Sequence, residues 1–184
     1  MMDQEKMRMI IRELIREEIA GIWSIDRSEI IENIYYLQDG ALILKPEHFD
    51  MTGWPPGEAE QHTPILCDCF DRGGTFYGAC ERSTLVGVAV LDSKFIGQRQ
   101  DQLQLKFLHV SRGYRKQGLG RTLFEKAVER ARQLGAKQLY ISATPSENTV
   151  NFYRNLGCKV TSEIDPELFE LEPEDIHFEY TLRP

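Results

Sequence analysis

Hydrophobic residues recur at helical spacing in two long stretches of the chain. From residue 3 to residue 19 an apolar stripe is flanked by charged positions, which predicts an amphipathic helix. Such a helix must bury its stripe, either on the rest of the protein or on a second chain. A longer stripe predicts a helix from about Gly118 to Leu134, with Gly135 at its C-terminal end. The apolar positions are Met7, Ile10, Ile11, Leu14, Ile15 and Ile19 in the first stretch and Leu119, Leu123, Phe124, Ala127, Val128, Ala131 and Leu134 in the second.

Runs of β-branched, aromatic and small apolar residues predict short strands between the helices. Residues 34–37 and 41–44 predict a hairpin, because the Asp39-Gly40 pair between them favours a tight two-residue turn. Residues 165–175 are acidic, contain two prolines and predict an exposed loop. The other predicted strands cover residues 21–25, 75–82, 84–91, 102–110, 138–143, 158–163 and 176–182, and the other predicted helices cover about 26–32, 58–71 and 146–156.

The order of these elements predicts one α/β domain over residues 21–184, preceded by the N-terminal helix within residues 1–20. A chain of 184 residues, 41% hydrophobic and 28% charged, has the size and mixture of one globular domain with a sizeable core. No apolar stretch is long enough to cross a bilayer and the start does not resemble a secretory signal, so we expect no membrane association. The N-terminal helix needs a surface to cover, which is consistent with a homodimer.

The formal net charge of -7 and the sequence pI of about 5.2 argue against nucleic acid as a partner. A duplex-binding protein needs a surplus of Lys and Arg to displace counterions from phosphates. An acidic protein instead favours a cationic substrate such as an amine. Neither the four cysteines nor the scattered histidines have the spacing of metal ligands or of a C-x-x-C redox motif. We therefore expect reduced thiols at Cys67, Cys69, Cys80 and Cys158, a cytoplasmic protein and no metal.

Residues 108–121 carry the most informative chemistry in the sequence. They run from a strand, through a glycine-containing turn, directly into the predicted long helix. The first backbone N–H groups of a helix lack helical partners, and the helix dipole adds positive potential there. Gly118 and Gly120 let a phosphate approach those groups closely. The segment therefore predicts a pyrophosphate cradle, to which three cationic side chains contribute: Arg115, Lys116 and Arg121.

Two other anion-binding motifs do not fit this segment. The P-loop pattern G-x-x-x-x-G-K-[ST] is absent, and Leu123 stands where the dinucleotide pattern G-x-G-x-x-G needs its third glycine. The pattern that remains, R-x-x-G-x-G after a strand, resembles the coenzyme A-binding motif of the GNAT N-acetyltransferase superfamily. Residues 142–158 resemble the second motif of that superfamily, a strand followed by a helix ending in F-Y-x-x-x-G. The two motifs and the strand before them cover about residues 103–160.

The resemblance implies a mixed, splayed, mostly antiparallel sheet flanked by helices, with acetyl-CoA (coenzyme A) as co-substrate between two parallel strands that separate. Backbone groups at Leu108 and Val110 would bind the pantetheine arm, with Ser146 or Asn148 as further partners. Tyr153 matches the tyrosine that acts as general acid toward the leaving thiolate. The N–H groups from Gln117 to Arg121 would hold the pyrophosphate. The implied cofactor-binding set is Leu108, His109, Val110, Arg115, Lys116, Gln117, Gly118, Leu119, Gly120, Arg121, Ser146, Asn148 and Tyr153.

The sequence departs from the superfamily at the position of the general base. An ammonium cannot attack a carbonyl, so the substrate must lose a proton before or during attack. Some relatives use a glutamate on the strand before the pyrophosphate loop, and Gln104 occupies that place here. An amide is no base at neutral pH. The remaining candidates are Glu81, Asp101, His109 and a water molecule held by backbone carbonyls, although His109 also fits a packed strand residue.

Residues 33–72 are expected to shape the acceptor pocket, because the superfamily varies there. The acidic stretch 165–175 is either a solvated loop or a part of the acceptor side. The candidate residues of an aromatic and acidic pocket for a cationic amine are Tyr35, Tyr36, Phe49, Trp54, Glu47, Asp50 and Glu58. The alternative is that these aromatic side chains only pack the edge of the domain.

The expected function is N-acylation of a primary amine by direct transfer from an acyl-coenzyme A, expected to be acetyl-CoA, in a ternary complex. We expect the amine to belong to a small molecule. Two alternatives stay open: a protein lysine or N-terminus as the acceptor, and a coenzyme A-binding regulatory module without catalysis. The missing glutamate at position 104 fits the regulatory module, whereas Tyr153 argues for an enzyme.

Overall fold

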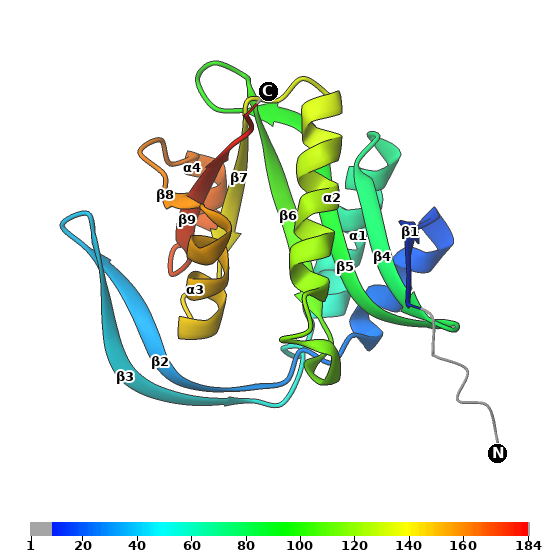
Figure 1. The fold of residues 1–184 in the computed structure, drawn as a ribbon, viewed down its shortest axis with the longest axis horizontal. Coiled ribbons are helices and arrows are strands. Elements are labelled where there is room, and N and C mark those ends of the chain that lie inside the picture. The colour runs from blue at the N-terminus through cyan, green and yellow to red at the C-terminus, as the bar shows by residue number, and fades with distance from the viewer. Residues whose placement is uncertain (1–8, 184) are drawn as a thin grey trace.

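A seven-stranded mixed sheet forms the centre of the protein in the computed structural model, which describes residues 9–183 (Figure 1). Its strand order is β1-β4-β5-β6-β7-β9-β8, and each neighbouring pair is antiparallel except β6 and β7. A two-stranded hairpin, β2 and β3, stands apart from it. The strands are β1 (Met9–Glu13), β2 (Glu29–Gln38), β3 (Ala41–Met51), β4 (Thr75–Glu81), β5 (Thr84–Ile96), β6 (Gln102–Val110), β7 (Gln138–Ala143), β8 (Lys159–Val160) and β9 (Ile176–Thr181).

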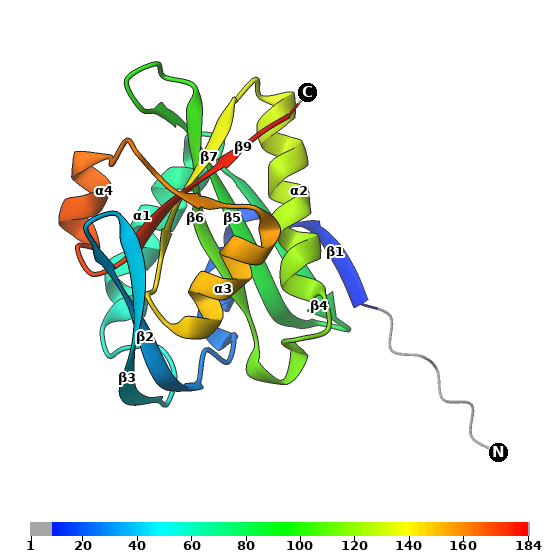
Figure 2. The same cartoon turned by 60° about the vertical axis from the view of Figure 1, so that its left-hand side comes forward.

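Helices cover both faces of the sheet, as the sequence predicts (Figure 2). Side chains of β5 alternate between the faces, since successive residues of a strand point to opposite sides. Ala89 and Leu91 pack in the cluster that contains α2 and α3, whereas Val88 and Val90 pack with α1. Among residues 9–183 no helix is long and apolar enough to cross a membrane. The α-helices are α1 (Glu58–Asp71), α2 (Leu119–Gln133), α3 (Glu147–Leu156) and α4 (Pro166–Leu171).

The parallel strands β6 and β7 pair over only three residues. Pairing runs from Gln102 opposite Gln138 to Gln104 opposite Tyr140, and beyond this point the register contains no β6–β7 pair within the described residues. β7 instead pairs with β9 along its whole length, up to Ala143. Figure 1 shows β6 and β7 separating toward their C-terminal ends. The splayed sheet implied by the sequence motifs is therefore present.

One extra residue, Lys106, lies in β6 close to the point where the pairing with β7 ends. In the register with β5, Val90 pairs with Phe107 and Leu91 pairs with Leu105, so Lys106 has no partner there. A bulge of this kind bends its strand and increases the local twist. We attribute the divergence of β6 from β7 to this bend.

A network of charged groups holds the bulge in place. The Lys106 ammonium lies 3.2 Å from a carboxylate oxygen of Asp92 and donates to Gln104 Oε1 at 3.0 Å. Arg72 donates to the other oxygen of Asp92 at 2.9 Å. Burial favours the neutral acid, but hydrogen bonds from Arg72 and the Lys94 N–H, together with the Lys106 charge, hold the pKa of Asp92 below its usual value. The carboxylate is therefore ionised and fully partnered.

The prediction of an N-terminal helix over residues 3–19 is wrong for the part of this segment that the structure describes. Met9–Glu13 is the strand β1, which pairs antiparallel with β4, and Arg16–Ser24 is a 3-10 helix. The edge of β4 offers unpaired N–H and C=O groups, and β1 satisfies them. Ile19 and Ile22 are buried against the sheet, whereas Ile10 and Ile15 of the presumed stripe are 49% and 59% exposed. Residues 1–8 lie outside the described residues.

Smaller differences affect the segments around the predicted elements. The strand expected at residues 21–25 belongs to the 3-10 helix, and the helix expected at 26–32 gives way to β2 from Glu29 onward. The loop expected at residues 165–175 contains α4, which begins with Asp165 accepting a hydrogen bond from the Leu168 N–H at 3.0 Å. An Asp-Pro pair at a helix start was the available signal for it.

The hairpin is confirmed and is longer than predicted. Asp39 and Gly40 both have positive φ, 49° and 78°, as the tight turn requires. Both strands extend well beyond the predicted residues, to Glu29–Gln38 and Ala41–Met51. The Tyr35 N–H donates to the Pro145 carbonyl at 2.8 Å, which joins the hairpin to the segment that follows β7.

We expect Gly78→Ala to destabilise the protein, because the N-terminal segment packs on β4 at that glycine. A Cβ there would lie 2.3 Å from Leu14 Cδ2 and 2.9 Å from Leu85 Cδ1. Overpacking of this kind costs about 1–3 kcal/mol, measurable by urea unfolding. Gly21→Ala is the matched control, since nothing lies within 4 Å of a Cβ there. Equal stability of the two variants would contradict the packing of Leu14 on β4.

Candidate active site

The start of α2 presents a row of backbone N–H groups. The first helical hydrogen bond runs from the Thr122 N–H to the Gly118 carbonyl at 3.0 Å, so the N–H groups from Leu119 to Arg121 have no acceptor within the helix. No side chain of the described residues caps this end. Lys116 and Gly118 both have positive φ, 59° and 85°, a backbone form that gathers N–H groups around an anion. The loop therefore has the geometry of the predicted phosphate cradle.

Gly118 and Gly120 have different surroundings, so the absence of a side chain has a different consequence at each position. At Gly118 the backbone is left-handed and nothing lies within 4 Å of an added Cβ, so the space above the N–H groups is open. At Gly120 an added Cβ would lie 3.3 Å from the Phe152 ring and 3.8 Å from Val110. Gly118 thus leaves room for a ligand, whereas Gly120 lets α2 pack closely against α3.

The side chain of Arg115 forms hydrogen bonds to backbone groups of the protein itself. It donates to the carbonyls of Val110, Ser28 and Asp26 at 2.8, 3.1 and 3.2 Å, which ties the loop to β6 and to the segment before β2. Gln117 donates to the Gly113 carbonyl at 3.1 Å. Of the three cationic side chains predicted here, Lys116 and Arg121 are exposed, and no hydrogen bond or ion pair to another residue of the 9–183 range engages them.

The main chain at the end of β6 faces the space between the parallel strands. The Ser111 N–H donates to Val86 of the preceding β4–β5 hairpin at 2.8 Å. Because main-chain groups alternate along a strand, those of Leu108 and Val110 point away from β5, toward β7. The Val110 carbonyl is taken by Arg115. Leu108 therefore offers both its N–H and its carbonyl to a ligand between β6 and β7, and Val110 offers its N–H.

His109 packs in an aromatic cluster on the other side of the strand. Its ring centroid lies 4.8 Å from that of Trp54 and 5.3 Å from that of Phe107. Burial, with smaller contributions from the charges of Arg27 and Arg115, lowers the pKa of His109 to about 3. The imidazole is therefore neutral at pH 7 and a weak base.

The three predicted residues of α3 have distinct surroundings. Ser146 is buried and caps the helix, since its hydroxyl accepts from the Thr149 N–H at 3.4 Å. Asn148 is exposed and donates to Glu29 Oε1 at 2.7 Å. The same Glu29 carboxylate lies 3.9 Å from Arg115, so one side chain of β2 connects the loop before α2 to α3.

Tyr153 lies on α3 with only 6% of its surface exposed. Its ring contacts Phe152, Phe178 and Phe124, with centroids 5.2, 6.0 and 6.4 Å away. Burial raises the pKa of Tyr153 well above its usual range, and nearby Cys158 and Asp175 act in the same direction. Its phenol is therefore protonated at neutral pH, the state that a proton donor needs.

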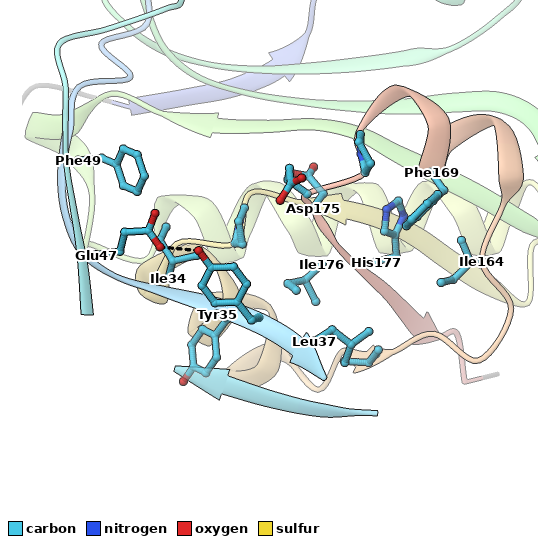
Figure 3. Close-up of a pocket in the computed structure, with 15 residues that line it drawn as sticks. Ile34, Tyr35, Leu37, Glu47, Phe49, Ile164, Phe169, Asp175, Ile176 and His177 are labelled. Atoms are coloured by element: carbon cyan, nitrogen blue, oxygen red, sulfur yellow. Dashed lines mark hydrogen bonds between the residues drawn. The ribbon is translucent and has the colours of Figure 1, made fainter. Parts of the chain in front are cut away.

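A pocket of about 470 Å³ opens between the hairpin and the segment that runs from β8 through α4 to β9. Figure 3 shows Glu47 and Phe49 of β3 on one side of it and Asp175 on the other. Pro145 and Ile176 also line it. Pro145 follows the end of β7, and Ile176 pairs with Ala143, the last residue of β7. The pocket therefore lies at the C-terminal end of β7, where β6 and β7 have separated.

Four of the seven candidate residues for an aromatic and acidic pocket line this one. Tyr35, Tyr36, Glu47 and Phe49 line the pocket, and the Tyr36 hydroxyl donates to Glu47. The other three residues do not line it. They are Trp54, which packs on Trp23 and His109, Glu58, which lies near Arg27 and His62, and Asp50 of β3.

A chain of hydrogen bonds anchors the far wall of the pocket to β7. His177 Nε2 lies 3.2 Å from the Glu172 carbonyl, which only accepts, so this nitrogen carries the hydrogen. Its Nδ1 therefore accepts from the Tyr140 hydroxyl at 2.7 Å. The Tyr140 oxygen in turn accepts from the Asp165 N–H at 3.1 Å. The segment from residue 165 to residue 177 is thereby held in one position.

Asp175 was not singled out by the sequence, where it is one of several acids in a presumed loop. Its carboxyl is half-buried and lines the pocket, and no hydrogen bond or ion pair from another described residue reaches it. Burial raises the pKa of Asp175 to about 7; the Glu172 charge adds to this effect and the Arg27 charge opposes it. Its place directly before the last strand was the only available signal.

The carboxyl groups that the sequence offered as bases lie away from this pocket. Glu81 is on β4, two strands from the gap, and accepts from the Tyr114 hydroxyl. Asp101 precedes β6 at the end where β6 and β7 are joined, and it pairs with Arg99 at 3.0 Å. Gln104 accepts a hydrogen bond from Lys106.

Three comparisons place this architecture among known proteins. The model of the Acetyltransferase (GNAT) family matches residues 40–158. A search of curated proteins finds no match. Among solved structures, nourseothricin acetyltransferase superposes with a TM-score of 0.70 at 16% sequence identity, over 95% of this chain and 99% of that one.

Two further structures were solved with a coenzyme bound. A protein of Bacillus anthracis str. Ames assigned as a streptothricin acetyltransferase, in complex with acetyl coenzyme A, has a TM-score of 0.68 and 16% identity over 95% of this chain and 99% of that one. PaiA N-acetyltransferase from Thermoplasma acidophilum, in complex with coenzyme A, has a TM-score of 0.63 and 19% identity over the same shares. The fold is common to all three. Since the family model matches more than half of the length of this chain, the chain belongs to the acetyltransferase (GNAT) family.

Proposed function

We propose that the protein transfers an acetyl group from acetyl-CoA to a primary amine of a small molecule, by direct transfer in a ternary complex. The observation that carries this proposal is the position of the aromatic and acidic pocket at the end of β7. An amine bound in this pocket would lie on the hairpin side of the space between β6 and β7. Two of the similar structures bind acetyl-CoA or coenzyme A, which supports the donor.

The residues around the gap fit acetyl-CoA, which is a substrate here and supplies the thioester. The unpartnered N–H groups at the start of α2 suit its pyrophosphate, with the open space at Gly118 and the exposed cations of Lys116 and Arg121. The free main-chain groups of Leu108 and the N–H of Val110 suit the pantetheine amides. Arg115 serves the loop rather than the ligand, since its guanidinium binds three carbonyls.

The pocket suits a small cationic amine. Its volume lies within the range of about 300–1,000 Å³ that small-molecule sites occupy. Glu47 and Asp175 both line it, and the rings of Tyr35 and Phe49 provide faces to which a cation is attracted. A recess of this kind favours a small molecule over a lysine on a protein surface.

Tyr153 is the proposed general acid. Its protonated phenol would give a proton to the sulfur as the carbon–sulfur bond breaks. The surrounding aromatic rings hold its own ring in one position.

Thiol release from acetyl-CoA, measured with a panel of amines, tests the proposed function. The panel contains monoamines, diamines, amine-bearing antibiotics and lysine-containing peptides, and mass spectrometry identifies the acetylated product. We expect turnover with small amines and little with peptides. Faster turnover of peptides would show that the acceptor is a protein. Coenzyme A binding without turnover of any amine would instead indicate a regulatory module.

Replacement of Tyr153 by phenylalanine tests the general acid. We expect Tyr153→Phe to lower kcat by about 10²-fold or more and to leave the KM for acetyl-CoA nearly unchanged. Tyr180→Phe removes a hydroxyl from another ring that contacts Phe124, 5.1 Å between centroids, and should keep full activity. Similar kcat values for both variants would remove Tyr153 from the mechanism.

A further inference from the structure

Two carboxyl groups that line the pocket, those of Glu174 and Asp175, have no hydrogen-bond or ion-pair partner among residues 9–183. Asp175 precedes β9 at the point where Ile176 pairs with Ala143, the last residue of β7. In Figure 3 Asp175 lies across from Glu47 and Phe49 of β3. An amine bound between these side chains lies beside the Asp175 carboxyl, at the end of β7 where the two parallel strands have separated.

We propose that Asp175 is the general base that removes a proton from the substrate ammonium, in the place that Gln104 leaves without one. This assignment rests on the proposed function. The carboxyl is half-buried, lines the pocket and has no hydrogen-bond or ion-pair partner among residues 9–183. Buried polar groups normally have partners, and an unpartnered carboxyl in a pocket is therefore available to a ligand.

Two other titratable groups of the pocket, His177 and Glu47, are hydrogen-bonded within the protein. Both ring nitrogens of His177 are engaged, one with Tyr140 and one with the Glu172 carbonyl. Glu47 accepts a hydrogen bond from the Tyr36 hydroxyl. Glu174 is exposed, so Asp175 is the half-buried carboxyl of the pocket whose oxygens have no protein donor among residues 9–183.

The surroundings of Asp175 bring its pKa close to neutral pH. Burial raises its pKa to about 7, Glu172 of its own loop adds to the shift, and Arg27 before β2 opposes it. The other acidic and phenolic groups that face it are Glu174 of its own loop, Glu47 and Tyr36 of the hairpin, and Tyr153 of α3. A base whose pKa lies near the working pH is ionised in a large fraction of molecules and still accepts a proton readily.

The reaction balances with Asp175 and Tyr153 as its two proton-transfer groups. The ammonium gives one proton to the Asp175 carboxylate, and the freed lone pair forms the bond from nitrogen to the thioester carbon. The carbon–sulfur bond breaks and sulfur leaves with its electron pair, taking the proton of Tyr153. The nitrogen's surplus proton restores the phenol, and the proton on Asp175 passes to solvent. The products are the amide, free coenzyme A and one proton.

The test compares Asp175→Asn with Glu170→Gln in the full-length protein, with an amine that the wild type acetylates. Glu170 is exposed on α4, so its replacement removes the same charge from the same segment outside the pocket. We expect Asp175→Asn to lower kcat at pH 7.5 by about 10²-fold or more, and Glu170→Gln to keep it. The KM for acetyl-CoA should stay within about twofold in both variants, because neither residue lies at the start of α2.

The pH dependence gives a readout that a purely structural role would not move. The wild-type kcat should rise from pH 5.5 and level off above the pKa of Asp175, and Asp175→Asn should lack this rise. The folded-state pKa is raised, so the proton on Asp175 stabilises the fold at low pH and this contribution is lost as the pH passes about 7. Asp175→Asn should therefore be at least as stable as the wild type at pH 8, which chemical unfolding measures.

Each outcome decides the assignment. Full activity and an unchanged pH profile in Asp175→Asn, while the wild type turns over, would overturn the role of Asp175 and leave the proposed function intact. Absence of turnover by the wild type with every amine would overturn the proposed function, and the assignment with it. A loss of activity accompanied by lower stability at pH 8 would show that Asp175 is structural.

Discussion

The buried charge cluster around Asp92 supports the bend on which the site depends. Arg72 and Lys106 neutralise this carboxylate, and Lys106 is the extra residue that puts a bulge in β6. Parallel pairing with β7 ends two residues earlier, at Gln104. A strand that bends away leaves its main-chain groups without a partner strand, and such groups must be satisfied by a ligand or by water. The gap proposed to bind the acyl donor is thus a consequence of sheet geometry.

The pocket proposed for the acceptor is formed by the hairpin and by the segment from β8 to β9, and both are anchored to the sheet. The hairpin is joined to the segment after β7 through Tyr35 and Pro145, and the opposite wall is fixed by Tyr140 and His177. Both attachments use residues on or directly after β7. The pocket and the open end of the gap therefore share one strand, which would align the proposed amine with the proposed acyl donor.

The sequence predicted best where a pattern was local. The strand, loop and helix around Gly118, the helix of Tyr153 and the Asp39-Gly40 turn depend on spacing within a few residues, and the structure contains them. The N-terminal strand depends on the free edge of β4, which lies about 70 residues away in the chain, and periodicity alone could not reveal it. Likewise, Asp175 became distinct only through burial and the absence of a partner, which no sequence pattern encodes.

The site itself shows the same division. Motif spacing identified the start of α2, the end of β6 and Tyr153 as parts of one site, but only the structure shows that the side chains of Arg115 and Ser146 form hydrogen bonds within the fold.

Whether the start of α2 binds the pyrophosphate of acetyl-CoA can be measured by calorimetric titration of acetyl-CoA into the wild type, Gly118→Asn and Gly118→Asp. Both replacements tolerate the left-handed backbone, and they differ only in charge over the N–H groups. We expect one site in the wild type, weaker binding to the Asn variant and no binding to the Asp variant. No binding to the folded wild type, or equal affinity of the two variants, would contradict this expectation.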